Sequence, residues 1–170
     1  MIELLILFVL TKKVLTMYGI SKTIKSYFSV LTIPSYGTIK PALNRLEKAG
    51  CLKVQKAMSK GGRPSTFYSI SDKGESELQQ LLLSVLPENP VQFLTVARIR
   101  LYCAEALEPQ KQKEMFLLLK NKAESLVIDS KILLKQNENE FYPKMVLDNL
   151  ICEYTNLISL LEGFERACNN

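Results

Sequence analysis

Apolar residues recur at helical spacing through the first 50 residues of the chain. Residues 1–10 are almost entirely apolar and predict a buried helix at the start of the domain. Thr16 can cap a second helix, whose buried side is formed by Tyr18, Ile20, Ile24 and Phe28. The first 30 residues therefore predict two packed helices.

A third helix is predicted after Pro34 and Ser35, which interrupt the chain. Its apolar residues Ile39, Leu43 and Leu46 recur at i, i+4 and i+7. Gly50 stands where a glycine commonly ends a helix. These signals give the third helix a beginning, a buried side and an end.

The pattern then changes from helical to extended. Residues 52–57 alternate apolar and polar side chains, and residues 66–70 are rich in aromatic and β-branched types. The segment between them, residues 58–64, contains two glycines, a proline and basic side chains. A β-hairpin with a basic tip is therefore expected.

The rest of the chain is predicted to be helical. Ser71 caps a helix over residues 72–86 that Pro87 and Pro90 end. Further helices are expected from about Phe93 to Pro109, over residues 110–136, and after a polar loop at residues 137–140 and Pro143. The stripe expected on the helix over residues 110–136 is Met115, Leu118, Leu119, Leu126 and either Ile132 or Leu133.

The last helix carries two interleaved apolar series with heptad spacing. They are Leu147, Tyr154 and Leu161, and Leu150, Leu157 and Phe164, and they are widened by Ile151 and Ile158. Three heptads of this kind favour packing of helix on helix, either within one protomer or between two protomers.

Three helices followed by a two-stranded hairpin is the order of a winged helix-turn-helix domain. The expected fold is mainly α with a small β-hairpin wing. A DNA-binding domain over residues 1–86 would be followed by an all-helical dimerisation domain over residues 87–170. In this arrangement the third helix reads DNA and the hairpin forms the wing.

Charge supports this division. The 170 residues include 22 Lys and Arg against 17 Asp and Glu, a net charge of +5 that decides little alone. Residues 1–75 contain twelve basic and four acidic residues, a net of +8, and residues 76–170 have a net of −3. A basic part joined to a slightly acidic part is typical of a nucleic-acid reader attached to a protein-contacting module.

The outward face of the third helix supplies the candidate DNA contacts. It combines hydroxyls, an amide, cations and a glycine that lets the backbone approach DNA, the types that bind phosphates and base edges. Pro41 is costly inside a helix because its ring meets the carbonyl of Gly37, which has no side chain and leaves room to relax. The candidates are Ser35, Tyr36, Gly37, Thr38, Lys40, Pro41, Asn44, Arg45 and Lys48.

The hairpin tip adds two more candidates. Lys60 and Arg63 flank two glycines, so they can reach a minor groove or phosphates while the backbone adapts. The alternative interpretation is an ordinary solvated loop.

Composition argues against catalysis and against a membrane protein. The chain has no His, which excludes mechanisms that need an imidazole, and its four Cys form no CxxC pair. No phosphate loop, paired-acid motif or metal-ligand cluster occurs, so neither an enzyme nor a cofactor is expected. The apolar run at residues 1–10 is about half the length of a membrane span. We therefore expect a soluble, cytoplasmic protein with reduced thiols.

Three ordered segments resemble those of a known family, the PadR-family transcriptional regulators. They are residues 17–24 (MYGISKTI), residues 37–50 (GTIKPALNRLEKAG) and residues 67–74 (FYSISDKG). The helical remainder is similar in length and layout to the family's C-terminal dimerisation region. The resemblance implies a bacterial, homodimeric repressor that binds a palindromic operator in double-stranded DNA and often releases it on binding a small-molecule effector.

The chain departs from the family at two points. Lys40 stands where members usually carry a tyrosine, so a phosphate contact expected of that ring passes to an ammonium. Some members hold flat drug-like molecules against a tryptophan at the dimer centre, and this chain has no Trp. Phe8, Phe93 or Tyr102 would have to take that role.

A sequence-specific DNA-binding regulator is the first hypothesis. The alternative is a winged-helix adaptor that contacts proteins without reading DNA. In an adaptor Lys40, Arg45 and Arg63 would be dispensable, and promoter occupancy would not change when all three are replaced with Ala. The basic character of residues 1–75 argues against the adaptor.

Overall fold

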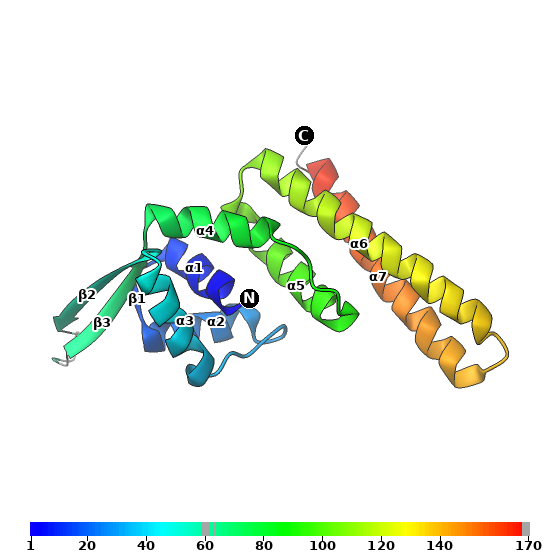
Figure 1. Ribbon diagram of the computed structural model, residues 1–170, viewed down its shortest axis with the longest axis horizontal. Helices are drawn as coiled ribbons and strands as arrows, with labels where there is room; N and C mark the ends of the chain where they lie inside the picture. The colour runs from blue at the N-terminus through cyan, green and yellow to red at the C-terminus, as the bar shows by residue number, and fades with distance from the viewer. Residues whose placement is uncertain (59–61, 63, 168–170) are drawn as a thin grey trace. The chain divides into compact units, whose positions relative to one another are not determined.

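The computed structural model describes residues 1–58, 62 and 64–167. The chain divides into two compact units, Met1–Ala106 and Leu107–Asn170. The elements of the first unit (Figure 1) are α1 (Ile2–Lys12), β1 (Leu15–Thr16), α2 (Met17–Phe28), α3 (Tyr36–Lys48), β2 (Leu52–Met58), β3 (Pro64–Ile70), α4 (Asp72–Leu83), α5 (Pro90–Tyr102) and a 3-10 turn at Ala104–Ala106. The predicted class, mainly helical with a small wing, is confirmed.

The first helix forms the centre of this unit. Every residue of α1 from Leu4 to Leu10 is buried, and the helix packs against α2, α3, α4 and β3. The apolar run at the start of the chain is therefore core, as predicted. Within the described residues, no helix has the length and apolar character needed to cross a bilayer.

The sheet has one strand more than the sequence predicted. Its order is β1-β3-β2, and all pairs are antiparallel. In β1, Leu15 pairs with Tyr68 and Thr16 with Phe67. Two residues are too few to show a period of two, so this strand left no pattern in the sequence. Thr16 also caps α2 as expected, because its Oγ1 accepts a hydrogen bond from the N–H of Gly19 at 3.2 Å.

A tight junction joins the end of α3 to the start of α4. Gly50 has a φ of +74°, and the N–H of Cys51 donates to the carbonyl of Leu46 at 2.9 Å, which ends α3 in a Schellman turn. The Ser71 hydroxyl donates to the carbonyl of Gly50 at 2.7 Å and accepts from the N–H of Gly74 at 3.1 Å. Ser71 therefore caps α4 and ties it to the end of α3.

Two boundaries in the first unit differ from those predicted. α4 ends at Leu83 rather than residue 86, because Ser84 is already extended. α5 ends at Tyr102, well before Pro109, and a 3-10 turn follows. At its beginning, the side chain of Asn89 caps α5 by accepting from the N–H groups of Val91 and Gln92 at 3.0 and 3.1 Å.

The second unit is a pair of long helices, α6 (Pro109–Gln136) and α7 (Phe141–Ala167), packed along their length (Figure 1). The rings of Phe116 and Phe164 stack with centroids 5.7 Å apart, and Lys120 Nζ lies 2.9 Å from Glu162 Oε1. Pro143 does not precede α7 as predicted. It lies in the first turn, where a proline loses no helical hydrogen bond.

The apolar stripes of these helices are only partly buried. Met115, Leu119 and Leu126 of the predicted α6 stripe are buried, but Leu118, Ile132 and Leu133 are exposed. On α7 the buried residues are Tyr154, Leu157 and Leu161, while Phe164 is exposed. Packing of α6 on α7 therefore leaves some of the apolar side chains of the two stripes exposed.

The compact first unit extends beyond the predicted DNA-binding domain. Its contacts include α5 and the 3-10 turn, up to Ala106. The predicted boundary after residue 86 separates functions rather than compact units, and it stays a prediction.

Cysteine reactivity offers a direct check of this packing. Cys51 and Cys103 are buried, and burial raises the pKa of both thiols, whereas Cys152 is exposed. We expect iodoacetamide at pH 8 to alkylate Cys152 rapidly and to spare the two buried thiols, because only an accessible thiolate reacts. Peptide mass spectrometry of the native protein, with urea-unfolded protein as the control, measures this. Equal labelling of Cys103 and Cys152 in the native protein would contradict the fold.

Candidate nucleic-acid interface

The third helix separates an apolar side from a polar side. Ile39, Ala42, Leu43 and Leu46 are buried against the first unit. All nine candidates predicted on this helix and its cap, Ser35 to Lys48, are exposed. The structure therefore brings the predicted residues together on one solvent-facing surface.

The beginning of α3 is open to an anion. Ser35 is the N-cap, but its side chain makes no capping hydrogen bond. The Thr38 hydroxyl instead donates to the carbonyl of Ser35 at 2.8 Å. The N–H groups of a first helical turn have no partner four residues back, and the helix dipole adds positive potential there. A phosphate can bind at such an end.

Gly37 and Pro41 fit in this helix without breaking it. α3 continues through Pro41 to Lys48, and the ring of Pro41 faces solvent. A Cβ atom built on Gly37 would have only the Ser35 Oγ nearby, at 3.6 Å. The fold itself therefore does not require glycine at this position.

Arg45 is engaged in the fold more than the sequence suggested. Its Nε and Nη2 donate to Oε1 of Glu3 at 3.0 and 2.5 Å, which links α3 to α1. Burial disfavours the charged form of Glu3, but the hydrogen bonds and charge of Arg45 outweigh it and lower the pKa of the carboxyl. Arg45 thus links α3 to α1, and the carboxylate of Glu3 partly balances its positive charge.

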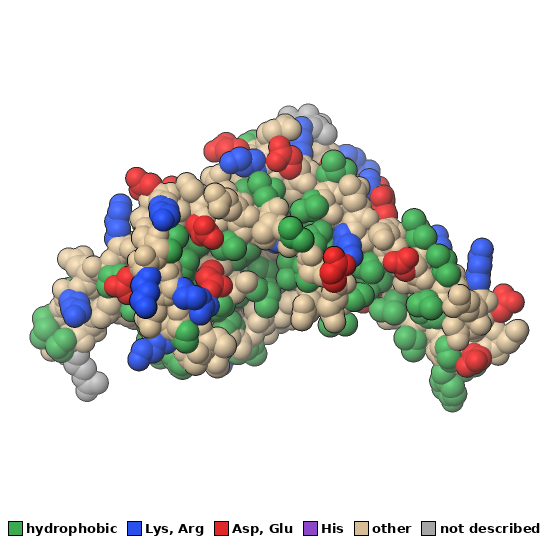
Figure 2. All heavy atoms as spheres, in the orientation of Figure 1, with side chains coloured by type: hydrophobic (Ala, Val, Ile, Leu, Met, Phe, Trp, Pro, Cys, Tyr) green, Lys and Arg blue, Asp and Glu red, His purple; other side chains and the backbone are tan. Residues whose placement is uncertain are grey.

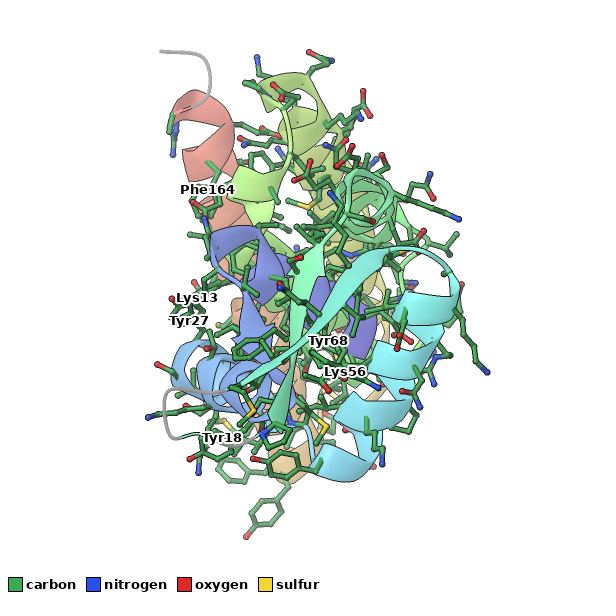
Figure 3. All side chains as sticks on the ribbon, turned by 90° about the vertical axis from the view of Figure 1, so that its left-hand side faces the viewer. Lys13, Tyr18, Tyr27, Lys56, Tyr68 and Phe164 are labelled. Carbon is green, nitrogen blue, oxygen red and sulfur yellow. The ribbon has the colours of Figure 1, made fainter. Side chains whose placement is uncertain are left out.

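A groove lies beside the exposed face of α3 and contains residues that the sequence analysis missed. Its volume is about 360 Å³, and α3 contributes Lys40 and Asn44. Strand β1, the start of α2 and strand β3 supply the rest of the lining, which is Thr16, Met17, Tyr18, Ser65, Thr66 and Tyr68. Tyr18, Lys56 and Tyr68 are labelled in Figure 3, which views the unit from the side of the hairpin.

Two of the missed side chains suit phosphate binding. The Tyr18 ring is 67% exposed, so the prediction that it belongs to the buried side of α2 is wrong, and its phenol is open to a ligand. Burial, and secondarily the charge of Glu47, raises the pKa of Tyr68, so its phenol stays protonated at neutral pH. A protonated phenol is a hydrogen-bond donor.

The hairpin contributes further basic residues. Lys53 and Lys56 on β2 are exposed, and Lys53 Nζ lies 3.8 Å from Asp72 Oδ1. Figure 2 shows Lys and Arg side chains gathered over α3 and the hairpin. The predicted wing-tip residues Lys60 and Arg63 lie outside the described residues. In the part of the chain that the structure describes, no three His, Cys, Asp or Glu residues are grouped so as to hold a metal ion.

Comparison with known proteins adds independent information. Residues 6–80 match the model of the Transcriptional regulator PadR-like family. Among curated proteins no match is found.

Several solved structures are similar to the chain. Bacillus subtilis PadR in complex with operator DNA is 18% identical, with 98% of each chain covered and a TM-score of 0.46. A PadR-like transcriptional regulator from Bacillus cereus is 20% identical over 99% of this chain and 98% of that chain, with a TM-score of 0.42. A transcriptional regulator from Clostridium thermocellum is 28% identical over 46% of this chain and 75% of that chain, with a TM-score of 0.42.

Proposed function

We propose that the chain is a member of the PadR-like family of transcriptional regulators, whose model matches residues 6–80, and that it binds double-stranded DNA. α3 would enter a major groove, and the β2–β3 wing would lie on the adjacent backbone or minor groove. The observation that carries the proposal is the face of α3, where every contact residue predicted on this helix is exposed beside a groove that three other elements complete.

Each part of this surface has a role in the proposal. The open N-terminus of α3 binds a phosphate, and Lys40 and Lys48 neutralise phosphates on either side. Asn44 lies in the same groove as Lys40 and has the amide that can pair with an adenine edge. Lys60 and Arg63 would extend the contact from the wing tip.

We propose that the active form is a homodimer that binds a palindromic operator. The observation behind this is the exposed apolar surface of α6 and α7, which includes Leu117, Ile128, Ile132, Leu133, Met145, Val146 and Leu160. Apolar surface of this extent along a helix pair favours burial against a second copy. Two protomers would then place their α3 helices one helical turn of DNA, or a multiple of it, apart.

We further propose that the protein is a cytoplasmic repressor whose DNA binding responds to a small molecule. These finer points rest on the family resemblance of residues 17–24, 37–50 and 67–74. In this proposal the chain is not an enzyme, and it binds DNA, a second copy of itself and an effector.

Binding to the duplex upstream of the protein's own reading frame tests the proposal. Fluorescence anisotropy at several salt concentrations should give a linear log–log plot with a slope of several units, because each neutralised phosphate releases counterions. Nuclease footprinting of the same duplex should show protection of an inverted repeat. Absence of binding, or binding that salt does not weaken, would favour the adaptor instead.

The Gly37→Ala variant tests whether glycine at this position serves DNA binding or folding. Ala has no close neighbour at this position and is a better helix former, so we expect the variant to be at least as stable as the wild type. Affinity for duplex DNA should fall, because a methyl group would stand between the backbone and the phosphate. Urea unfolding and anisotropy on the same sample measure the two effects. A variant that binds DNA as well as the wild type would show that no close approach occurs at Gly37.

A further inference from the structure

A buried arginine in the first unit has no acidic partner among the residues that the structure describes. Arg100 on α5 is 3% exposed. Its Nη1 donates to the carbonyl of Ser84 at 2.8 Å, and its Nη2 donates to the Ser84 hydroxyl at 2.7 Å and to the carbonyl of Val85 at 3.5 Å. These bonds fasten α5 to the segment that follows α4, but all three acceptors are neutral.

The charge and one donor of Arg100 stay uncompensated. Its Nε is buried without a hydrogen-bond partner. Burial lowers the pKa of the guanidinium, and no carboxylate among the described residues counteracts this. A buried cation without a counter-ion carries a desolvation penalty that an anion beside it would offset.

Arg100 lines a pocket that can hold a small molecule. The pocket has a volume of about 260 Å³ and lies between the start of α1, the end of α4 and α5. An apolar cavity of about 150 Å³ is enough to bind benzene. The other side chains of its wall are aliphatic except for Ser84, and they include Leu4, Leu81, Leu86, Val96 and Ile99. A second apolar groove shares Met1, Pro87 and Val96 with it and continues the surface.

We propose that this pocket binds an aliphatic monocarboxylate. The carboxylate would pair with the Arg100 guanidinium, and the hydrocarbon chain would lie against the aliphatic wall and extend toward the adjoining groove. An aliphatic chain suits the pocket because no aromatic ring lines it for stacking. Arginine pairs with carboxylates through short charge-assisted hydrogen bonds, so the ligand must be an anion rather than its neutral analogue.

The pocket is connected to the proposed DNA-binding helix. Met1, the N-cap of α1, and Leu4 in its first turn line the pocket, and Glu3 between them accepts the two hydrogen bonds of Arg45 on α3. A ligand that displaces this turn therefore moves the anchor of α3. This regulatory step rests on the proposed function, whereas binding of the carboxylate does not.

Calorimetry with hexanoate and its neutral analogue hexanamide, in the absence of DNA, tests the site. The wild type should prefer hexanoate by about tenfold or more, and Arg100→Met should lose this preference. Arg98→Met removes a cation from an exposed position of the same helix and should keep it. Equal affinity of the wild type for both compounds, or an unchanged preference in Arg100→Met, would overturn the proposal.

Two further measurements guard against a purely structural role of Arg100. Val96→Phe fills the pocket and leaves Arg100 and its bonds to Ser84 in place, so hexanoate binding should be lost while the unfolding midpoint is kept. Retained binding in this variant would place the ligand elsewhere. In the presence of operator DNA, hexanoate should change the DNA affinity of the wild type and of Arg98→Met, and it should leave the DNA affinity of Arg100→Met unchanged. Hexanoate binding without any change in DNA affinity would overturn the regulatory step alone.

Discussion

Replacing Lys40 and Lys48 with Gln is expected to weaken binding to duplex DNA about sixtyfold for each bound protomer at 0.1 M salt. Both ammonium groups lie on the exposed face of α3. Each phosphate contact contributes about 0.9 powers of ten to the association constant at this salt concentration, and two contacts contribute about twice as much. The slope of the log–log salt plot should therefore become less steep by about 1.8 for each protomer, which is about 3.6 for the proposed homodimer.

The matched control removes the same charge from the other unit. Lys135 on α6 and Lys144 on α7 are also exposed, and replacing both with Gln lowers the net charge by the same amount. We expect nearly wild-type affinity and slope from this control. Equal losses in the two double variants would mean that only total charge matters and that α3 is not the contact surface.

Arg45 is better left out of this test. Since it donates to Glu3, its removal would leave a partly buried carboxylate without a partner and loosen α1 from α3. A loss of DNA binding in Arg45→Ala would then report on folding as much as on contact. Lys40 and Lys48 avoid this problem, because no salt bridge found among the described residues includes them.

Gly74→Ala is expected to be the most destabilising small substitution in the first unit. A Cβ atom at this position would lie 2.2 Å from the backbone oxygen of Cys51 and 2.8 Å from Cγ1 of Ile70. The Cys51 oxygen cannot yield easily, because it also accepts the N–H of Ser71 at 3.0 Å. We expect a loss of about 3 kcal/mol, which would lower the unfolding midpoint by more than about 10 °C.

Gly37→Ala is the natural control for this substitution. Both glycines lie in the first turn of a helix of the same unit, and only Gly74 has backbone within contact distance of the new methyl group. Circular dichroism during heating compares the two variants. A Gly74→Ala protein as stable as the wild type would show that the α3–α4 junction is looser than described.

Most of the fold could be predicted because its signals are local. Thr16, Ser71 and Gly50 mark helix ends by the chemistry of their own side chains, and each does so in the structure. Strand β1 was missed because only its pairing with β3 makes it a strand, and its partners Tyr68 and Phe67 lie more than 50 residues away in sequence. The end of α4 was placed too late for a similar reason, since the bonds of Arg100 hold Ser84 in an extended conformation.

The candidate site was predictable to the extent that it lies on one helix. Helical spacing is enough to place the polar residues of α3 on one face. It cannot show that Thr16, Tyr18 and Tyr68 close a groove beside Lys40, since these come from three other segments. Nor can it show the pairing of Arg45 with Glu3, because the two residues are 42 positions apart. In the long helices, spacing identified apolar residues but could not divide them between the interior and an exposed surface.

Photo-crosslinking measures contact between α3 and DNA most directly. A benzophenone amino acid is introduced in place of Tyr36 at the start of α3 or, as a control, in place of Tyr142 on α7, both of which are exposed. On irradiation with the upstream duplex, we expect a covalent protein–DNA adduct from position 36 and none from position 142. An adduct from position 142 alone, or from neither position while the protein is bound, would contradict the proposal that α3 reads DNA.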